Sequence, residues 1–426
     1  MIALSPEIQA PPEAPSVVEL PLGPPLSFER RAVAALASLY AFRMLGLFMV
    51  LPILTLYGDA YTGSTPLLIG VALGAYGFSQ SLLQIAFGSL SDRWGRKPVI
   101  ALGLLIFALG SVVAAMADSM WGLILGRCLQ GCGAIASVIM ALVADLTSEE
   151  NRTKAMASIG ASIGLSFSLA LVLGPLVSQW GGLSAVFWLT AILALIGLFV
   201  LWRWVPTPEV SNRHREAGAV PELWGTVLRD PELRRLNLGI FVLHFVLMAC
   251  FMVLPGILEN TLDLSRDIHW KIYLPILLLA FVAMVPLMII AEARRKIKPV
   301  FVFSVALLGV MIVLMGFWQE RLWLCIGALF FFFMAFNLLE AMLPSLMSKV
   351  APAGAKGTAM GVYSTCQFLG AFLGGVTSGY LIEGYGTAAV FQCALVLVVL
   401  WLLAAISMRP PRFLTSVQVP LAGLPL

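Results

Sequence analysis

The chain has 426 residues, of which 60% are apolar and 11% are charged, and its mean hydropathy is +0.96. A soluble protein of this length needs a charged surface, so the composition excludes a soluble globular protein and suits about twelve membrane spans of ~20 residues each. The net charge of +4 is too small for a nucleic-acid-binding protein, and no nucleic-acid partner is expected.

The predicted elements are a tail and a series of membrane spans. Residues 1–30 are rich in proline and lack the basic start and continuous apolar stretch of a cleaved signal peptide, which predicts a cytoplasmic tail. Residues 155–202 carry no formal charge over a length that suits two crossings, with a turn near Gly181-Gly182. The predicted spans are 33–57, 60–91, 98–117, 119–144, two within 155–202, 236–258, 272–291, 299–319, 322–346, 357–382 and 384–408.

The basic side chains indicate which way the spans face, because Lys and Arg accumulate on the cytoplasmic side of a membrane. With the N-terminus inside, only Arg266, Lys271 and Arg321 of the 26 Lys and Arg fall in outer loops, and only Arg43 and Arg127 fall inside spans. Both termini are therefore predicted to be cytoplasmic, in a multi-pass protein of the inner cell membrane.

An internal repeat divides the chain. Residues Phe48–Pro52 in the first span recur as Phe251–Pro255 in the seventh, and Lys154–Met156 has a looser match in Thr358–Met360. The repeat predicts an all-α membrane protein of twelve helices in two pseudo-symmetric six-helix halves. Parallel repeats of this kind place a substrate site at mid-membrane between the halves. The predicted division is a tail 1–30, halves 31–205 and 236–408, a cytoplasmic linker 206–235 and a tail 409–426.

The loop after the second span combines a glycine, an acid and a basic turn. It runs from Gly88 to Pro98 and includes Asp92, Arg93, Gly95 and Arg96. A short basic loop alone is an ordinary cytoplasmic anchor. The order of residues adds more: Gly88 allows close helix approach, Asp92 lies at the membrane edge, and Gly95 provides a tight turn. This run resembles the cytoplasmic loop signature of the major facilitator superfamily.

The resemblance implies that the loop is a conformational latch. Asp92 is then expected against the N-terminal end of the eleventh helix, near residues 354–357, where the helix dipole favours a negative charge. Arg96 is expected to pair with Asp145 at the inner end of the fourth helix, which holds the cytoplasmic gate closed. The alternative for Asp145 is an ordinary acid at a helix end.

The fourth span contains a second family motif. Residues Arg127–Gly133 resemble the family's fourth-helix motif. A guanidinium inside a span needs hydrogen-bond acceptors or a water-filled cavity, because it stays charged. The resemblance implies that Arg127 lies near a proton-transfer path. The alternative is a structural arginine that bonds to carbonyls of neighbouring helices.

The fifth span contains small residues and a proline. Gly160, Gly164 and Gly174 are expected to let helices approach closely, and Pro175 to loosen the helical hydrogen bonds where bending is needed. The segment resembles the family's antiporter motif, although Ser178-Gln179 stands where that motif has a glycine pair.

Three further stretches resemble one branch of the drug/proton antiporter group within this family. They are residues 42–52, 337–341 and 356–361, and the resemblance covers all twelve spans. Members of that branch carry a small cytoplasmic domain after the last helix. Only residues 409–426 follow the last span here, so any function of that domain is expected to be absent.

Ionisable side chains deep in spans indicate functional sites. They are Arg43, Arg127, His244 and Glu340. Glu340 is the only carboxylate well inside a span, which makes it a candidate to load and release a proton, with His244 as its partner. The alternative is that Glu340 forms a salt bridge with an arginine and holds the bundle together. Asp59, at the outer mouth of the first span, is a weaker candidate because it is expected to be solvated.

Polar uncharged side chains complete the candidate cavity. Gln80, Gln84, Asn337 and Gln367 are candidates for polar contacts with a substrate, and a helix–helix hydrogen bond explains each of them equally well. The cysteines and histidines lack the spacing of a metal site, and no nucleotide-binding loop or clustered catalytic set is visible. The sequence therefore predicts no metal, no cofactor and no enzyme.

The predicted function is proton-coupled export of a small, amphipathic molecule by alternating access, as in multidrug efflux. The expected partners are the lipid bilayer, protons and the substrate, with no obligatory protein partner. One alternative is an uptake symporter or uniporter for a polar metabolite, which the lack of an acid in the middle of the first span favours. A non-transporting membrane sensor is the alternative from another class.

Overall fold

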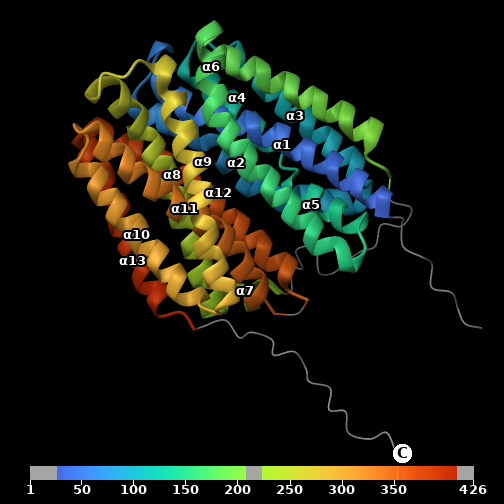
Figure 1. Ribbon diagram of the computed structural model, residues 1–426. Helices are drawn as coiled ribbons and strands as arrows, with labels where there is room; N and C mark the ends of the chain where they lie inside the picture. Colours follow the sequence, from blue (N-terminus) through green and yellow to red (C-terminus); the bar gives the residue numbers. More distant parts are fainter. Residues whose placement is uncertain (1–25, 208–222, 353, 410–426) are drawn as a thin grey trace, which may run out of the picture.

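The computed structural model describes residues 26–207, 223–352 and 354–409 (Figure 1). Predictions for most of the N-terminal tail, part of the linker and nearly all of the C-terminal tail lie outside the described residues. Within those ranges the chain is helical, and the only β-bridge joins Thr62 to Ser119. Eleven helical segments of the described chain are long and apolar enough to cross a membrane.

The helices follow the predicted spans in order. They are α1 (Leu26–Tyr57), α2 (Pro66–Trp94), α3 (Arg96–Ala115), α4 (Met120–Cys132), α5 (Ala136–Asp145), α6 (Glu149–Trp204), α7 (Trp224–Arg229), α8 (Pro231–Gly256), α9 (His269–Ala293), α10 (Ile297–Phe317), α11 (Leu322–Val350), α12 (Lys356–Tyr385) and α13 (Thr387–Ile406). Short turns η1 (Gly58–Ala60), η3 (Ile257–Thr261) and η4 (Arg266–Ile268) lie between them. In Figure 1, α1 to α6 form one half of the bundle and α8 to α13 form the other.

Helix α6 contains two crossings. Its backbone leaves helical geometry at Gly181 and at Gly182, whose φ of 61° favours glycine. The contacts with α1 show that α6 runs along that helix in both directions. Ser166 contacts Ala41 and Gly174 contacts Met49, further along α1, whereas the later Gly197 contacts Leu39, back near the first position. The chain therefore reverses at Gly181-Gly182, as predicted, and the twelve-helix membrane fold is confirmed.

The fourth span is interrupted, which the sequence did not predict. Helix α4 ends at Cys132 and α5 starts at Ala136, and the Ile135 N–H donates to the Gly133 carbonyl at 2.9 Å. A Cβ on Gly133 would lie 2.4 Å from the Gly103 carbonyl oxygen, so α3 passes too close for any other residue. The break separates the outer part of this span from the part that ends at Asp145.

Two predicted boundaries were wrong. Helix α1 starts at Leu26, inside the predicted tail 1–30, and Glu29 is buried where it accepts hydrogen bonds from Ser148 N–H and Asn151. The predicted linker 206–235 contains α7 and the first turns of α8. Asp230 caps α8 by accepting from the Glu232 and Leu233 N–H groups, a signal that the hydropathy pattern does not contain.

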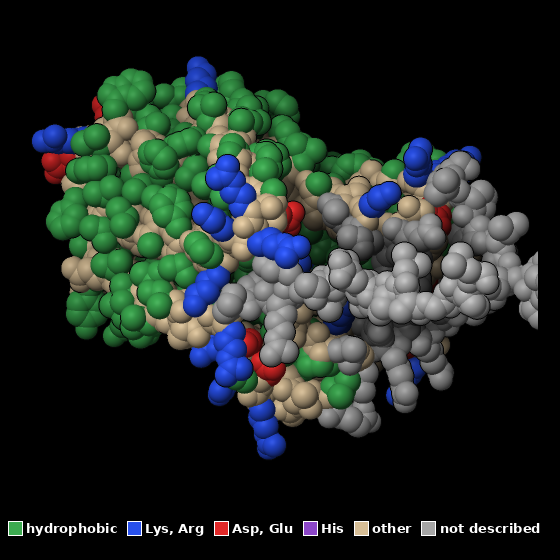
Figure 2. Space-filling model, turned by 60° about the horizontal axis from the view of Figure 1, so that its bottom comes forward, with side chains coloured by type: hydrophobic (Ala, Val, Ile, Leu, Met, Phe, Trp, Pro, Cys, Tyr) green, Lys and Arg blue, Asp and Glu red, His purple; other side chains and the backbone are tan. Residues whose placement is uncertain are grey.

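The two ends of the bundle differ in charge. One end, which we call the basic end, carries the exposed side chains of Arg31, Arg93, Arg203, Arg294 and Lys349. Figure 2 shows Lys and Arg gathered there, with hydrophobic side chains covering the flank of the molecule. The opposite end contains η1, η3 and η4, which join helices at the far side of the bundle.

The two halves meet at this opposite end through backbone contacts between α2 and α12. A Cβ on Gly70 would lie 2.1 Å from the Gly375 carbonyl oxygen, and one on Gly379 would lie 2.3 Å from the Pro66 carbonyl oxygen. The Leu67 N–H also donates to Glu383 at 3.3 Å. Only glycine permits this approach, so the end opposite the basic end is closed.

The glycines of α6 differ in their surroundings. Gly174 is buried, and a Cβ there would lie 2.8 Å from the Met49 carbonyl oxygen, so α1 and α6 do approach through it, next to the buried Pro175. The expectation of close packing was wrong for Gly160 and Gly164, because a Cβ on either would have no atom of another residue within 4 Å. Residue spacing does not tell which face of a helix meets a neighbour.

Gly174→Val is expected to destabilise the fold, because its Cβ would press on the backbone of Met49 and on Ile53. Overpacking of this kind costs about 1–3 kcal/mol. The midpoint of thermal unfolding in detergent measures the effect. Gly164→Val is the matched control on the same helix and should leave the midpoint near that of the wild type. An equal decrease of the midpoint in both variants would contradict the packing argument. The decrease would then come from replacing glycine by valine in a helix and not from the contact with Met49.

Candidate functional site

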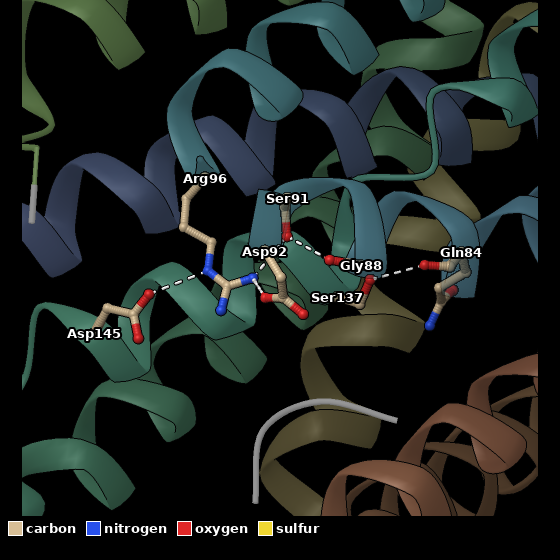
Figure 3. A network of polar contacts seen from close by, with 7 residues as sticks. All are labelled: Gln84, Gly88, Ser91, Asp92, Arg96, Ser137 and Asp145. Carbon is tan, nitrogen blue, oxygen red and sulfur yellow. Dashed lines mark hydrogen bonds and ion pairs between the residues drawn. The ribbon is translucent and has the colours of Figure 1, made fainter. Parts of the chain in front are cut away.

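The loop between α2 and α3 turns at Gly95. Its φ is 94°, and its N–H donates to the Ser91 carbonyl at 3.1 Å, which ends α2. The turn places Arg96 at the first position of α3, beside the last turn of α2 and the end of α5 (Figure 3). The predicted tight turn is therefore present.

Arg96 connects three helices. Its Nε donates to Asp145 at 3.1 Å, and one terminal nitrogen donates to Asp92 at 2.5 Å and to the Ser91 hydroxyl at 2.6 Å (Figure 3). The side chains of Arg96 and Asp145 are only 8% and 2% exposed, whereas Asp92 is 45% exposed. The Arg96–Asp145 pair is thus a buried ion pair, and Asp92 contacts it from the solvent-exposed side.

The other residues of the predicted latch have different surroundings. The contacts of Asp92 with Arg96 lie inside the first half, so its placement against the start of α12 stays a prediction. Arg93 is exposed. The expectation that Gly88 allows close helix approach was wrong: a Cβ there would lie 3.7 Å from the Ser137 hydroxyl, which is ordinary contact.

Asp145→Asn is expected to destabilise the protein more than Asp92→Asn. Asp145→Asn removes the more buried of the two acids and leaves Arg96 with Asp92 alone. Asp92→Asn removes only a half-exposed pair, which is worth about 1 kcal/mol or less. The comparison uses the midpoint of thermal unfolding in detergent. Asp92→Asn is the control, because it makes the same substitution in the other acid that pairs with Arg96. A lower midpoint for Asp92→Asn than for Asp145→Asn would contradict this.

Arg43 lies fully buried in the first half. It donates to Gln80 at 2.6 Å and to the Gly133 carbonyl at 2.9 Å, and its guanidinium lies 5.6 Å from the centre of the Phe107 ring. Gly133 is where the fourth span breaks, so Arg43 adds a second donor to a carbonyl that also accepts from the Ile135 N–H. Among the described residues no acid pairs with Arg43.

Arg127 is buried next to it. It donates to the carbonyls of Ala72 and Leu73 at 3.2 and 3.3 Å, and to Gln130 at 2.8 Å. These contacts match the structural alternative, in which the arginine bonds to helix carbonyls. A role in proton transfer stays a prediction.

Sequence reasoning missed Tyr76. Its ring centre lies 5.7 Å from the guanidinium carbon of Arg43 and 5.4 Å from that of Arg127, so both cations lie against one aromatic ring. Gln130 belongs to the motif Arg127–Gly133 but was given no role of its own, although its spacing of three from Arg127 on a helix was a usable signal. Its amide donates to Ser111 of α3 at 2.8 Å, a contact that only the packing reveals.

The second half brings together Glu340 of α11, His244 of α8 and Gln367 of α12. Glu340 Oε2 lies 3.9 Å from His244 Nδ1, and the Gln367 amide nitrogen lies 3.3 Å from Glu340 Oε1 and 2.9 Å from His244 Nε2. His244 Nδ1 also lies 3.3 Å from the Ile240 carbonyl. The side chain that the structure places beside Glu340 is this histidine and not an arginine.

An aromatic cluster joins this polar set to the first half. The Phe167 ring of α6 lies 6.3 Å from Phe336 and 6.2 Å from Phe333, both on α11, and 6.4 Å from Phe251 on α8. Phe336 in turn lies 6.2 Å from the His244 ring. Aromatic faces and a carboxylate with a histidine therefore lie side by side where the two halves meet.

The remaining candidates do not join this set. Gln84 is buried, and its backbone carbonyl accepts from Ser137 at 3.2 Å (Figure 3). Asn337 is half-buried one turn before Glu340. Asp59 is exposed on η1. Within the described ranges, no group of three or more His, Cys, Asp or Glu side chains could hold a metal ion.

Comparison with known proteins gives one family. A family model described as Major Facilitator Superfamily matches residues 36–375. The inner membrane transport protein YajR of Escherichia coli is 49% identical over 92% of this chain and 86% of its own length. Multidrug resistance protein 2 of Bacillus subtilis is 24% identical over 80% of this chain and 86% of its own. The crystal structure of a D-xylose-proton symporter has a TM-score of 0.71 at 16% identity, covering 90% of this chain and 98% of that one.

Proposed function

The chain belongs to the major facilitator superfamily and is a membrane transporter, not an enzyme, and from that premise we propose that it exports a small amphipathic molecule in exchange for protons. The proposed setting is the inner membrane, with the basic end and both termini on the cytoplasmic side. Proton coupling, the direction of transport and the class of substrate are the proposed parts.

The observation that carries proton coupling is the contact of Glu340 with His244 and Gln367. Oε2 of Glu340 is buried and accepts no hydrogen bond within the described chain, and 3.9 Å separates it from His244 Nδ1. When Glu340 gives off a proton, its carboxylate can attract a protonated His244, and when it takes up a proton this attraction is lost. Because the two side chains stand on different helices, α11 and α8, the proton changes how firmly these helices hold together.

The aromatic cluster supports an amphipathic substrate. A molecule with one apolar and one cationic part finds ring faces at Phe167 and Phe336 and a carboxylate at Glu340, all at the meeting of the halves. Mid-membrane sites between repeats are where transporters of parallel-repeat architecture bind substrate. The relative named for multidrug resistance supports export of this class of molecule.

Alternating access is supported by how the two halves meet at one end of the bundle. The α2–α12 contact at Gly70 and Gly375 closes the end opposite the basic end. The Gln179 amide adds a hydrogen bond to the Asp267 carbonyl at 3.3 Å between the halves at the same end. In the proposed orientation this is the state closed to the outside, from which the halves rock about the central site.

The test is proton movement in proteoliposomes. Vesicles with an acidic lumen and an internal pH dye receive lipophilic cations, sugars and amino acids one at a time. We expect a lipophilic cation to collapse the gradient in vesicles that contain the protein and not in protein-free vesicles. Tracer uptake that proceeds without any dependence on pH would replace the proposal with a uniporter. Binding of a compound without accumulation of it would replace the proposal with a sensor.

A further inference from the structure

A pocket of about 270 Å³ lies at the basic end, where the start of α1 meets the end of α6. Figure 1 shows these two helix ends side by side. Its lining residues come from the two helices and the segment after α6: Phe28, Arg31, Ala32, Arg203, Trp204, Val205 and Pro206. The site lies on the flank of the first half, away from Glu340 and His244.

The pocket has an excess of positive charge. Arg31 and Arg203 are both exposed, and in the described part of the chain neither forms an ion pair. The nearby acid on α1, Glu29, is turned to Ser148 and Asn151 and is buried. Lys97 adds a third cation: its Nζ donates to the Val205 carbonyl at 2.7 Å and lies 5.2 Å from the Trp202 ring centre.

Guanidinium groups on one rim select a phosphate. Arginine offers paired N–H donors that match the oxygens of a phosphate, and its charge does not depend on pH in the physiological range. Two exposed arginines from different helices can therefore hold one phosphate from two sides. The pocket volume of about 270 Å³ leaves room for the glycerol that a lipid phosphate carries.

The surroundings favour a lipid over a free phosphate. Trp202 and Trp204 are 60% and 44% exposed, and exposed indoles mark the level of the lipid headgroups. Below them α6 exposes Ile192, Leu195 and Phe199, which share one face by their spacing of three and four. This apolar stripe leads from the pocket toward the middle of the membrane, where an acyl chain would lie.

We infer that this pocket binds the phosphate headgroup of an anionic phospholipid, with Arg31 and Arg203 as its ligands and the α6 stripe under one acyl chain. Basic pockets between helices on the cytoplasmic side are suited to anionic headgroups. The inference does not depend on which substrate the protein carries. It requires only that the basic end face the leaflet that holds the lipid.

The experiment measures lipid binding to the full chain purified in detergent, by native mass spectrometry with added phosphatidylglycerol or phosphatidylcholine. We expect a bound phosphatidylglycerol in the wild type, no comparable phosphatidylcholine, and about tenfold or more weaker binding in Arg31→Gln/Arg203→Gln. Arg294→Gln/Lys296→Gln removes the same charge from exposed positions elsewhere on the basic end, and should bind as the wild type does.

Three results would overturn the inference. Equal binding by the wild type and the Arg31→Gln/Arg203→Gln variant places the lipid elsewhere. Equal loss in the Arg294→Gln/Lys296→Gln control means that the whole basic end attracts anions without a site. Displacement of the lipid by inorganic phosphate or by glycerophosphoglycerol at concentrations similar to that of the lipid means that the acyl chain adds nothing, and the site is one for a free anion. The melting temperature of each variant in detergent checks that it is folded.

Discussion

Gly375→Val is expected to abolish transport while the protein remains folded. A Cβ on Gly375 would lie 2.5 Å from the Gly70 carbonyl oxygen, and this contact joins α12 to α2 across the two halves. Neither atom can move aside, because the Gly70 oxygen belongs to the backbone and the added Cβ is bonded directly to the backbone of residue 375. The closed arrangement of the end opposite the basic end is thus excluded, whereas the interior of each half is not touched.

The size of this effect follows from population arithmetic. Two states within a few kcal/mol of each other exchange their populations when one gains a penalty of about 5 kcal/mol. A backbone overlap of this kind leaves the state with α2 and α12 in contact too rare to support turnover. We expect initial transport rates to fall by about two orders of magnitude or more.

Distances between spin labels test the structural cause. Labels at Asp59 and Tyr385, both exposed at the end opposite the basic end, should move apart in Gly375→Val. Gly361→Val is the matched control on the same helix, since nothing lies within 4 Å of a Cβ there. Unchanged label distances together with full transport in Gly375→Val would falsify the role given to this contact.

Glu340→Gln is expected to remove proton-coupled flux by about a hundredfold or more, because an amide keeps the size of the side chain and cannot take up a proton. The Gln367 amide nitrogen can still donate to the new side-chain oxygen, as it donates to Glu340 at 3.3 Å. Folding and substrate binding should therefore persist. Exchange of labelled for unlabelled substrate, which needs no net proton movement, should also persist.

Asn337→Ala is the control for this variant. Asn337 lies one turn earlier on α11, is half-buried and makes no side-chain hydrogen bond among the described residues. Its replacement should leave coupled flux close to that of the wild type. If Glu340→Gln retains coupling, Glu340 is not the proton carrier, and His244→Gln and Asp59→Asn become the variants to measure.

The membrane fold followed from the sequence because long apolar stretches and their charged boundaries are local features. The turn at Gly181-Gly182 was predictable for the same reason, since two glycines interrupt a charge-free stretch of double length. The break in the fourth span was not. It depends on how closely Gly133 approaches the Gly103 carbonyl and on the side chain of Arg43, which reaches it from another helix.

The sequence predicted single residues of the candidate site, but only some of the contacts between them. Depth in the membrane suggested Glu340 and His244 together, and the structure brings them within 3.9 Å. Nothing in the sequence assigned Gln367 to them, because its role depends on which face α12 turns to α8 and α11. For Arg127 two interpretations were open, and the carbonyl contacts that distinguish them exist only in the packed bundle.

The ionisable side chains inside the two six-helix halves differ, and this difference determines where the membrane voltage can act on transport. Arg43 and Arg127 are buried in the first half without an acidic partner in the described chain, and arginine stays protonated throughout the physiological pH range. The charge that these two arginines contribute is therefore constant, and under the proposed coupling Glu340 is the group that takes up and gives off the proton. A unit charge that crosses the whole membrane exchanges about 2.3 kcal/mol per 100 mV with the field. Under the proposed coupling, the voltage sensitivity of transport originates in the second half, and the first half is an electrically fixed frame.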